Sequence, residues 1–336
     1  MKTYIPYSLL LAAAASGLAF GQTAYTTPVG YTTSALASGQ FSFVGLTVHT
    51  PTKFAGVISA ESSNSVTVGG TDFVALLGTP NPSALYPLTY VLELPNGTIQ
   101  EITNWTNTGV LTTPENITAQ VVPGTTTFKL RKAATISDIF GATNSAGLKP
   151  DTNGNFDANA DVITVIGAGG VPTKVYYFND GAGTQGWFDA NNNEAQNLPL
   201  VYADGFYVKR QVGSLINLVV SGEVKTVPTS GSLINGFNFL SPVAPVGLTL
   251  DSSNLKNFVS ASGDGNIEAV DNVLLPQANG SFITAYYFND GAGTVGWFQT
   301  NNDPAGQLAL EGGFLVLNRG LLKPYTLSVP TYYSSL

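Results

Sequence analysis

Two short stretches of the chain carry acidic, amide and aromatic side chains around the same glycine-rich turn. The stretches are YYFNDGAGTQGWF, starting at Tyr176, and YYFNDGAGTVGWF, starting at Tyr286, and twelve of their thirteen positions are identical. An indole ring can stack on the apolar face of a sugar while a carboxylate and an amide bond its hydroxyls. The sequence therefore allows a glycan-binding site that occurs twice and gains avidity from the repetition. Its candidate residues are Asp180, Trp187, Asn191, Asp290, Trp297 and Asn301.

The same motif also has a purely structural interpretation. YYF is typical of the end of a strand, NDGAGT of a turn that needs positive φ, and GWF of the returning strand. Each tryptophan would then cover the core of its module. Turn geometry and packing do not obviously demand that Ala182 and Thr184 recur as Ala292 and Thr294. That recurrence keeps the binding hypothesis open beside the structural one.

Catalytic chemistry finds little support among the residue types. A duplicated Asp-Gly resembles the shared carboxylate pair of bilobal aspartic proteases, but those enzymes carry Ser or Thr directly after the aspartate. The chain has a single histidine, His49, and no cysteine, and it lacks the G-x-S-x-G turn of serine hydrolases. We therefore predict no catalytic residues and do not expect an enzyme.

One polar loop alternates the oxygen-bearing side chains that suit a hard cation such as Ca²⁺. This loop, DTNGNFDANAD, departs from the EF-hand because Phe156 replaces its glycine and Val162 stands where its last carboxylate would be. Asp161 recurs in register as Asp271, and each could equally cap a turn before a strand. A polar loop without metal is the competing interpretation, and no other cofactor is expected. The candidate Ca²⁺ ligands are Asp151, Asn153, Asn155, Asp157 and Asp161.

The composition excludes some partners and suggests a location. The 13 basic residues are outnumbered by 21 acidic ones, and no basic run exceeds two residues, so nucleic-acid binding is not expected. The first residues, MKTYIPYSLLLAAAASGLAFG, combine a positive start, an apolar stretch and small residues, which predicts a signal peptide at 1–21. We expect an exported protein at the cell surface, outside the cell, or in the periplasm or outer membrane.

Strand patterns dominate the rest of the chain. Helical periodicity is limited to TISDIFGA (135–142), with Thr135 or Ser137 as cap, and SSNLKNFVSA (252–261). Short strands between turn residues predict a mainly β fold of tandem homologous antiparallel β-sandwich or barrel-like modules with one or two short helices. The expected strands include FSFVGLTV (41–48), SVTVGG (65–70), LTYVLEL (88–94), DVITVIG (161–167), KVYYF (174–178), GFYVKRQ (205–211), LINLVVSGEV (215–224) and GFLVLN (313–318).

Self-similarity divides the mature chain into modules. The motif recurs at an offset of 110 residues, which predicts repeat modules at 131–225 and 226–336. A degenerate third copy at 22–130 is suggested by the likeness of Phe41 to Phe237 and of Tyr90 to Tyr286, both at an offset of 196 residues. In that copy Trp105 would stand for Trp187, and FKLRK (128–132) for FYVKR.

The order of these motifs resembles a family of secreted β-rich proteins from Verrucomicrobia and Planctomycetes whose function is uncharacterised. The resemblance rests on PVGYTTSALASGQFSFVGLTV, ISDIFGA, ADVITV, VYYFNDGAGTQGWF, DGFYVKR, SGEV and NGFNFLSPVAPVGLTL. It implies an exported envelope or extracellular protein and supplies no catalytic residues.

The sequence therefore predicts a secreted or cell-envelope protein with a structural or binding role. Its partners would be glycans, other envelope proteins, or further copies of itself in a surface layer or fibre. A carbohydrate-binding adhesin that uses the Asp/Trp loops is one alternative. An outer-membrane β-barrel is another, because low charge and abundant aromatics also fit that class.

Overall fold

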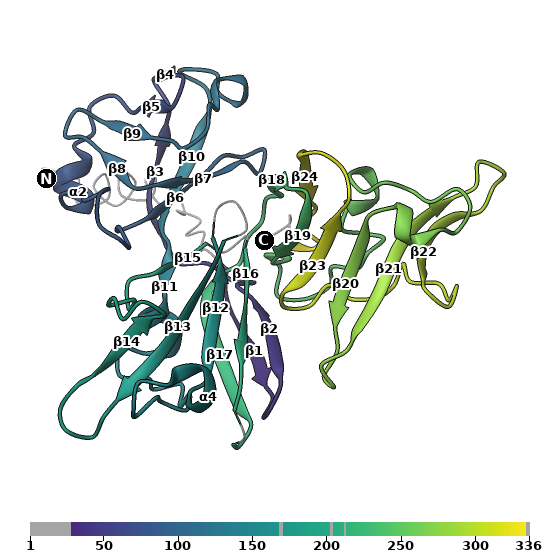
Figure 1. Ribbon diagram of the computed structural model, residues 1–336. Coiled ribbons are helices and arrows are strands. Elements are labelled where there is room, and N and C mark those ends of the chain that lie inside the picture. Colours follow the sequence, from purple (N-terminus) through teal and green to yellow (C-terminus); the bar gives the residue numbers. More distant parts are fainter. Residues whose placement is uncertain (1–27, 168–170, 202–203, 212, 334–336) are drawn as a thin grey trace, which may run out of the picture.

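The computed structural model describes residues 28–167, 171–201, 204–211 and 213–333, which form several antiparallel sheets and a few short helices (Figure 1). Strands account for 42% and helices for 8%, which confirms the predicted mainly β class. The expected signal peptide at 1–21 lies outside the described residues. Within the described ranges, no helix combines the length and the apolar character needed to cross a membrane.

The middle of the molecule contains a five-stranded sheet in the order β14-β13-β12-β16-β2. Two further pairs of strands, β1 with β17 and β11 with β15, flank this sheet. We call these elements, with the short helices between them, the middle module. They are β1 (Val29–Leu36), β2 (Phe41–Gly45), β11 (Ala134–Thr135), α3 (Ile136–Phe140), α4 (Phe156–Asn159), β12 (Val162–Ile166), β13 (Pro172–Asn179), β14 (Gln185–Asp189), β15 (Pro199–Leu200), β16 (Gly205–Lys209) and β17 (Ile216–Glu223).

The C-terminal module repeats this arrangement. Its five-stranded sheet has the order β22-β21-β20-β23-β19, and β18 pairs with β24 as β1 pairs with β17. A 3-10 turn follows β19 where the middle module has helix α3. The elements are β18 (Thr229–Leu233), β19 (Gly236–Leu240), η3 (Leu255–Asn257), η4 (Ile267–Ala269), β20 (Asn272–Pro276), β21 (Phe282–Asn289), β22 (Val295–Gln299), β23 (Phe314–Asn318) and β24 (Lys323–Leu327).

The N-terminal domain, residues 52–132, has a four-stranded sheet in the order β3-β10-β6-β7 and a smaller sheet in the order β4-β5-β9-β8. In the larger sheet the first strand pairs with the last, as in the other two modules. The elements are β3 (Thr52–Val57), β4 (Ala60–Ser62), β5 (Ser65–Thr67), α2 (Phe73–Leu77), β6 (Tyr90–Glu93), β7 (Ile99–Ile102), β8 (Asn104–Trp105), β9 (Val110–Thr112), η1 (Thr118–Gln120) and β10 (Thr127–Lys132).

The structure divides the chain differently from the predicted boundaries at 130 and 225. Strands β1 and β2 pair with β17 and β16, so they belong to the middle module, and Leu36 and Val44 pack in its core. The N-terminal domain is thus inserted between β2 and β11. Phe41 on β2 does correspond in position to Phe237 on β19. Tyr90 does not correspond to Tyr286 in this way. Counted along the chain, Tyr90 lies on β6, the second strand of its sheet, whereas Tyr286 lies on β21, the third strand of its sheet. The insertion could not be predicted from the sequence, because strands that pair across 160 residues or more, as Gly45 does with Gly205, leave no local pattern in the sequence.

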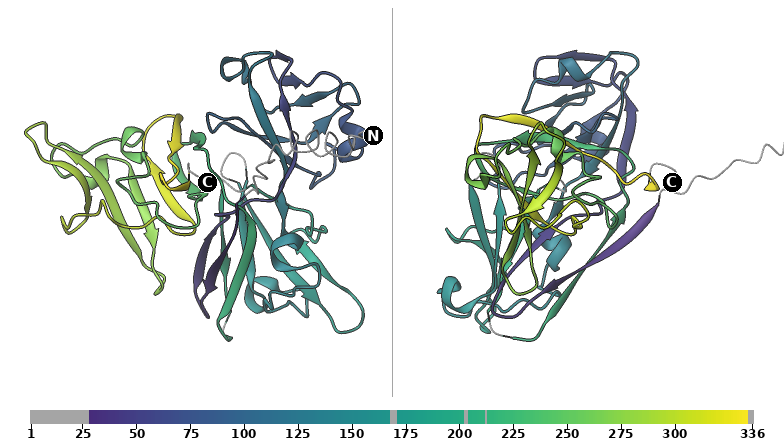
Figure 2. Two further views of the ribbon diagram at one scale, coloured as in Figure 1. Left: turned by 180° about the vertical axis from the view of Figure 1, so that it is seen from behind. Right: turned by 90° about the vertical axis from the view of Figure 1, so that its right-hand side faces the viewer.

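Each of the three units has its own buried apolar cluster. That of the N-terminal domain runs from Ile58 to Leu130, and that of the C-terminal module from Leu233 to Leu327. The middle cluster combines Leu36, Val44 and Leu46 with residues from Ala133 to Leu218, and it also takes in Val91 of the N-terminal domain and Val243 after β19. Figures 1 and 2 show the N-terminal domain and the C-terminal module both resting against the middle module.

The middle and C-terminal modules pack through the corresponding strands β2 and β19. The rings of Phe43 and Phe239 stack with centroids 5.4 Å apart and planes 16° apart. Phe239 also lies directly on Gly205, where an added Cβ would come within 1.7 Å of the ring. A Cβ added at Gly45 would lie 2.8 Å from the carbonyl oxygen of Gly312, so bare backbone on both sides allows this approach. Corresponding strands of the two modules therefore meet at this contact.

Candidate functional site

The repeated motif forms a long hairpin in each module, and its glycine-rich part is the exposed tip. In the middle module the hairpin is β13–β14, and Tyr177 pairs with Trp187. In the C-terminal module it is β21–β22, and Tyr287 pairs with Trp297. Residues 180–185 and 290–295 are all exposed. The turn and returning strand that the sequence predicted are therefore present in both copies.

Each tip is held by the same set of hydrogen bonds. Asp180 Oδ1 accepts from the backbone N–H of Ala182 (2.7 Å) and Thr184 (3.0 Å). Asp290 accepts from Ala292 (2.8 Å) and Thr294 (3.0 Å) in the same way. The bond from Ala182 has the largest effect, and together these bonds hold the pKa of Asp180 below its usual range.

The tip geometry accounts for part of the repeated sequence. The threonine hydroxyl also bonds to the aspartate, so Thr184 and Thr294 each close their turn. Gly181 (φ 70°) and Gly183 (φ 119°) adopt positive φ, a region that a glycine enters without strain. Ala182 lies between them and is exposed, and it bonds to Asp180 through its backbone N–H, which any residue except proline could supply. The alanine is thus the one repeated tip residue that the fold leaves unexplained.

The structure does not gather the predicted sugar-binding residues into one site. Trp187 and Trp297 are each only 2% exposed and belong to the cores, so neither indole offers a surface for stacking. Asp180 and Asn191 lie at opposite ends of β14, and Asp290 and Asn301 at opposite ends of β22. Both asparagines are exposed, and Asn301 is occupied with Asp303 at 2.7 Å.

The indole nitrogens show what these tryptophans do. Trp187 Nε1 donates to the carbonyl of Gly141, directly after helix α3, at 2.8 Å. Trp105 Nε1 makes the same bond to Gly78, directly after helix α2, at 2.8 Å. Trp297 Nε1 is buried and has no partner in the described part of the chain. Two of the three tryptophans therefore fix the end of a short helix against the core.

The two tips project at opposite ends of the molecule. Figure 1 shows the β13–β14 tip at the lower left and the β21–β22 tip at the far right, and the reversed view in Figure 2 agrees. The tips cannot therefore converge on one small ligand.

The loop proposed for Ca²⁺ uses its carboxylates for other contacts. Asp157 pairs with Lys174 Nζ at 2.9 Å, and Asp161 with Arg210 Nε at 2.8 Å. Asn153 Oδ1 accepts from Asn155 N–H and from the Asn159 amide. Asp151 is buried, with Oδ1 bonded to Asn153 N–H at 3.3 Å. Within the described ranges no three acidic or histidine side chains are grouped to hold a metal ion.

The recurrence of Asp161 as Asp271 has a structural cause. Asp161 is fully buried and accepts from the N–H groups of Lys149 and Gln211, which joins the loop before β12 to the end of β16. Asp271 accepts from Ser260 and Arg319 N–H, which joins the corresponding segments. Burial alone would raise the pKa of Asp271, but these bonds and the Lys323 ammonium hold it below its usual range.

A buried group of charges joins the N-terminal domain to the middle module. Arg131 Nε lies 3.2 Å from Glu93 and its Nη1 bonds to Glu223, while Lys225 Nζ lies 2.6 Å from Glu93. His49 packs beside them, and burial together with Arg131 lowers its pKa to about 3. Lys225 and Arg131 hold the pKa of Glu93 at about 2 against the opposite effect of its burial. Sequence inspection missed this group because its members come from four separate segments.

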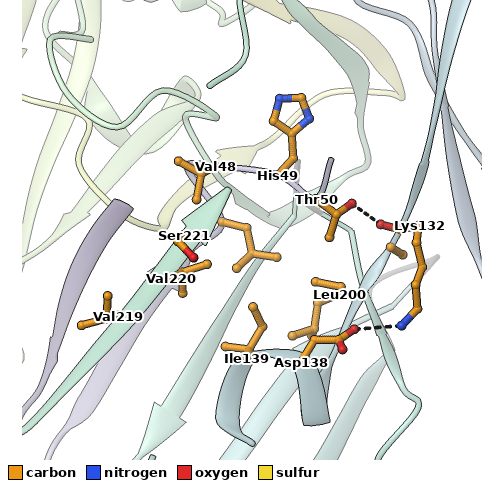
Figure 3. A pocket seen from close by; sticks show the side chains of 13 residues that line it. Val48, His49, Thr50, Lys132, Asp138, Ile139, Leu200, Val219, Val220 and Ser221 are labelled. Carbon is orange, nitrogen blue, oxygen red and sulfur yellow. Dashed lines mark hydrogen bonds and ion pairs between the residues drawn. The ribbon is translucent and has the colours of Figure 1, made fainter. Parts of the chain in front are cut away.

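A small pocket of about 160 Å³ lies beside this junction, between residues 46–50, α3 and β17. Figure 3 shows Lys132 reaching Asp138, at 3.2 Å, and the His49 ring turned away from the other lining side chains. The rest of the lining is mostly aliphatic, including Ile139 and Leu200.

In comparisons with known proteins, no family model, no curated protein and no solved structure matches the chain.

Proposed function

We propose that the protein is an exported structural or binding protein of the cell envelope or extracellular space, without catalytic activity. In this role its two hairpin tips contact two copies of the same partner and bridge them. The observation that carries the proposal is the pair of tips, which share their sequence and hydrogen bonds and point in opposite directions. A rigid exposed loop costs little entropy to bind, and repetition supplies avidity.

Internal duplication supports this proposal. We propose that the middle and C-terminal modules are copies of one unit and that the N-terminal domain is a third, divergent copy inserted into the first. The first-strand-to-last-strand pairing recurs in all three sheets, and the indole bonds of Trp105 and Trp187 correspond. FKLRK then holds the place of FYVKR, on β10 and β16.

Substitution of the tip alanines tests the bridging role. Ala182→Arg and Ala292→Arg change the exposed surface of each tip without touching its hydrogen bonds. We expect the parent protein to sediment with envelope material from the producing cells and to cross-link fragments of it. Each single variant should bind without cross-linking, and the double variant should do neither.

Ala190→Arg together with Thr300→Arg is the matched control, since both residues are exposed at the other end of the same hairpins. A parent protein that does not sediment, or a double variant that cross-links like the parent, contradicts the proposal. Sedimentation of the protein alone at rising concentration separates self-assembly from binding to another partner. N-terminal sequencing of protein recovered outside the cytoplasm should place cleavage near Gly21.

A further inference from the structure

A cleft of about 190 Å³ lies where all three units of the molecule meet. Glu101 on β7 comes from the N-terminal domain, Asp204 precedes β16 of the middle module, and Tyr325 lies on β24 of the C-terminal module. The backbone of Ser230 bonds to Gly97 at 2.8 Å beside it and fixes β18 against the N-terminal domain. A second hollow of about 130 Å³ shares Glu101 and Asp204 with this cleft.

Five oxygen-bearing side chains line the cleft, and that of Asn238 is bonded to neighbouring backbone. The side chains of Glu101, Asp204 and Tyr325 have no hydrogen-bond partner in the described part of the chain. Glu101 is exposed, Asp204 is half-buried, and Tyr325 is only 3% exposed. Burial and the nearby Glu101 carboxylate raise the pKa of Asp204 to about 7. Burial also raises the pKa of Tyr325, and the charge of Asp204 adds to that effect. Ionised Asp204 beside Glu101, and a buried Tyr325 hydroxyl without a partner among the described residues, are costly unless a ligand compensates for them.

The remaining walls indicate the kind of ligand. They combine aliphatic side chains, Ile99, Ile166 and Leu240 among them, with the polar Ser232 and Asn238, and no basic side chain of the described residues lines either hollow. A divalent cation prefers six or more oxygen ligands, whereas only two carboxylates are present. A primary ammonium has three N–H donors, which can be shared among the Glu101 and Asp204 carboxylates and the Tyr325 hydroxyl. An apolar stem behind the ammonium would lie against the aliphatic walls.

We propose that this cleft binds a primary alkylammonium group, with its charge between Glu101 and Asp204 and its third N–H toward the Tyr325 hydroxyl. The group is either that of a free alkylamine or that of a lysine side chain. Because the three residues come from three units, the bound ammonium also ties the units together. This site is separate from the hairpin tips and does not depend on their role.

Calorimetry on the purified protein at pH 8 tests the proposal, with n-butylamine and an N- and C-blocked lysine tripeptide as the two probes. We expect one of them to bind, and the probe that binds identifies the source of the ammonium. Butanol, which lacks the charge, should not bind, and neither should Ca²⁺. Asp204→Asn or Glu101→Gln should weaken binding roughly tenfold or more. Glu311→Gln, an exposed residue outside the cleft, should leave binding unchanged.

The stability of the variants makes the result decisive. Asp204→Asn removes the repulsion from Glu101, so the ligand-free variant should unfold at or above the temperature of the parent while its binding is lost. Absence of binding by both amines, equal binding of butanol, binding of Ca²⁺ in their place, or unchanged affinity in Asp204→Asn would each overturn the proposal.

Discussion

Phe43 and Phe239 occupy corresponding positions on β2 and β19, and the two rings stack on each other across the contact between their modules. A contact between corresponding residues is what a two-fold symmetric dimer has, here built within one chain. The glycines beside the rings, Gly205 and Gly313, leave the space that Phe239 fills.

Removing one ring should weaken this contact. Phe239 is 6% exposed, so Phe239→Ala should destabilise the protein by about 3 kcal/mol in urea unfolding. A double-mutant cycle with Phe43→Ala should give a coupling energy of about 1 kcal/mol, typical of an aromatic pair. Phe41→Ala is the control, because Phe41 is 50% exposed on the same strand. Additive losses from Phe43 and Phe239 would show that the stacking contributes nothing.

The corresponding aspartates should differ in importance. Asp161→Asn leaves Arg210, which is 5% exposed, without its counter-charge, and we expect a loss of about 3–5 kcal/mol. Asp271→Asn should cost clearly less, because the Lys323 side chain is 25% exposed and can turn to water. Urea unfolding of the two variants side by side measures the difference. Equal losses would mean that the backbone bonds, and not the buried charge, set the cost.

The buried histidine should make stability depend on pH. The folded pKa of His49 is about 3 and its usual value is 6.5, so below pH 6.5 only the unfolded chain takes up the proton. Stability therefore falls on acidification between these values, by about 1.4 kcal/mol per pH unit. His49 is the only histidine, and His49→Gln should remove this component.

The test is the difference in unfolding free energy between parent and His49→Gln from pH 7 to pH 4. Asp204, whose raised pKa gives the opposite slope, is present in both proteins and cancels in the difference. A difference that stays constant with pH would mean that the folded protein protonates His49 as readily as the unfolded chain.

The three tryptophans should respond unequally to phenylalanine. Trp187→Phe and Trp105→Phe remove an indole donor and leave the carbonyls of Gly141 and Gly78 without it, a further cost of about 1–3 kcal/mol. Trp297→Phe removes an N–H that has no partner among the described residues, so it should cost only the lost packing. Thermal unfolding of the three variants checks this order. A loss at Trp297 as large as at Trp187 would contradict it.

Local sequence predicted local structure well. Strands such as Val162–Ile166 and Phe314–Asn318 follow β-branched and aromatic runs between turn residues, and helix α3 has Thr135 as its N-cap in a complete capping box. The second expected helix reduces to the 3-10 turn η3. These features depend on neighbours in sequence, which a reader of the sequence can see.

Features that depend on distant pairing could not be predicted. The sequence left two interpretations of Trp187 open, a surface for sugar stacking or a cover over the core, and its 2% exposure in the folded chain supports the second. The cleft joins Glu101, Asp204 and Tyr325, which have no common spacing or motif. Only the packing of three separate units brings them together.

The insertion of the N-terminal domain has a consequence for biosynthesis. The strands within residues 52–132 pair with one another, so this domain can fold as soon as it leaves the ribosome. Strands β1 and β2 cannot pair until much later, because Val29 pairs with Glu223 and Phe41 with Lys209. The sheets of the middle module can therefore be completed only after about two thirds of the chain has been synthesised, when the inserted N-terminal domain is already present. Until then β1 and β2 are nascent strands without partners, open to aggregation.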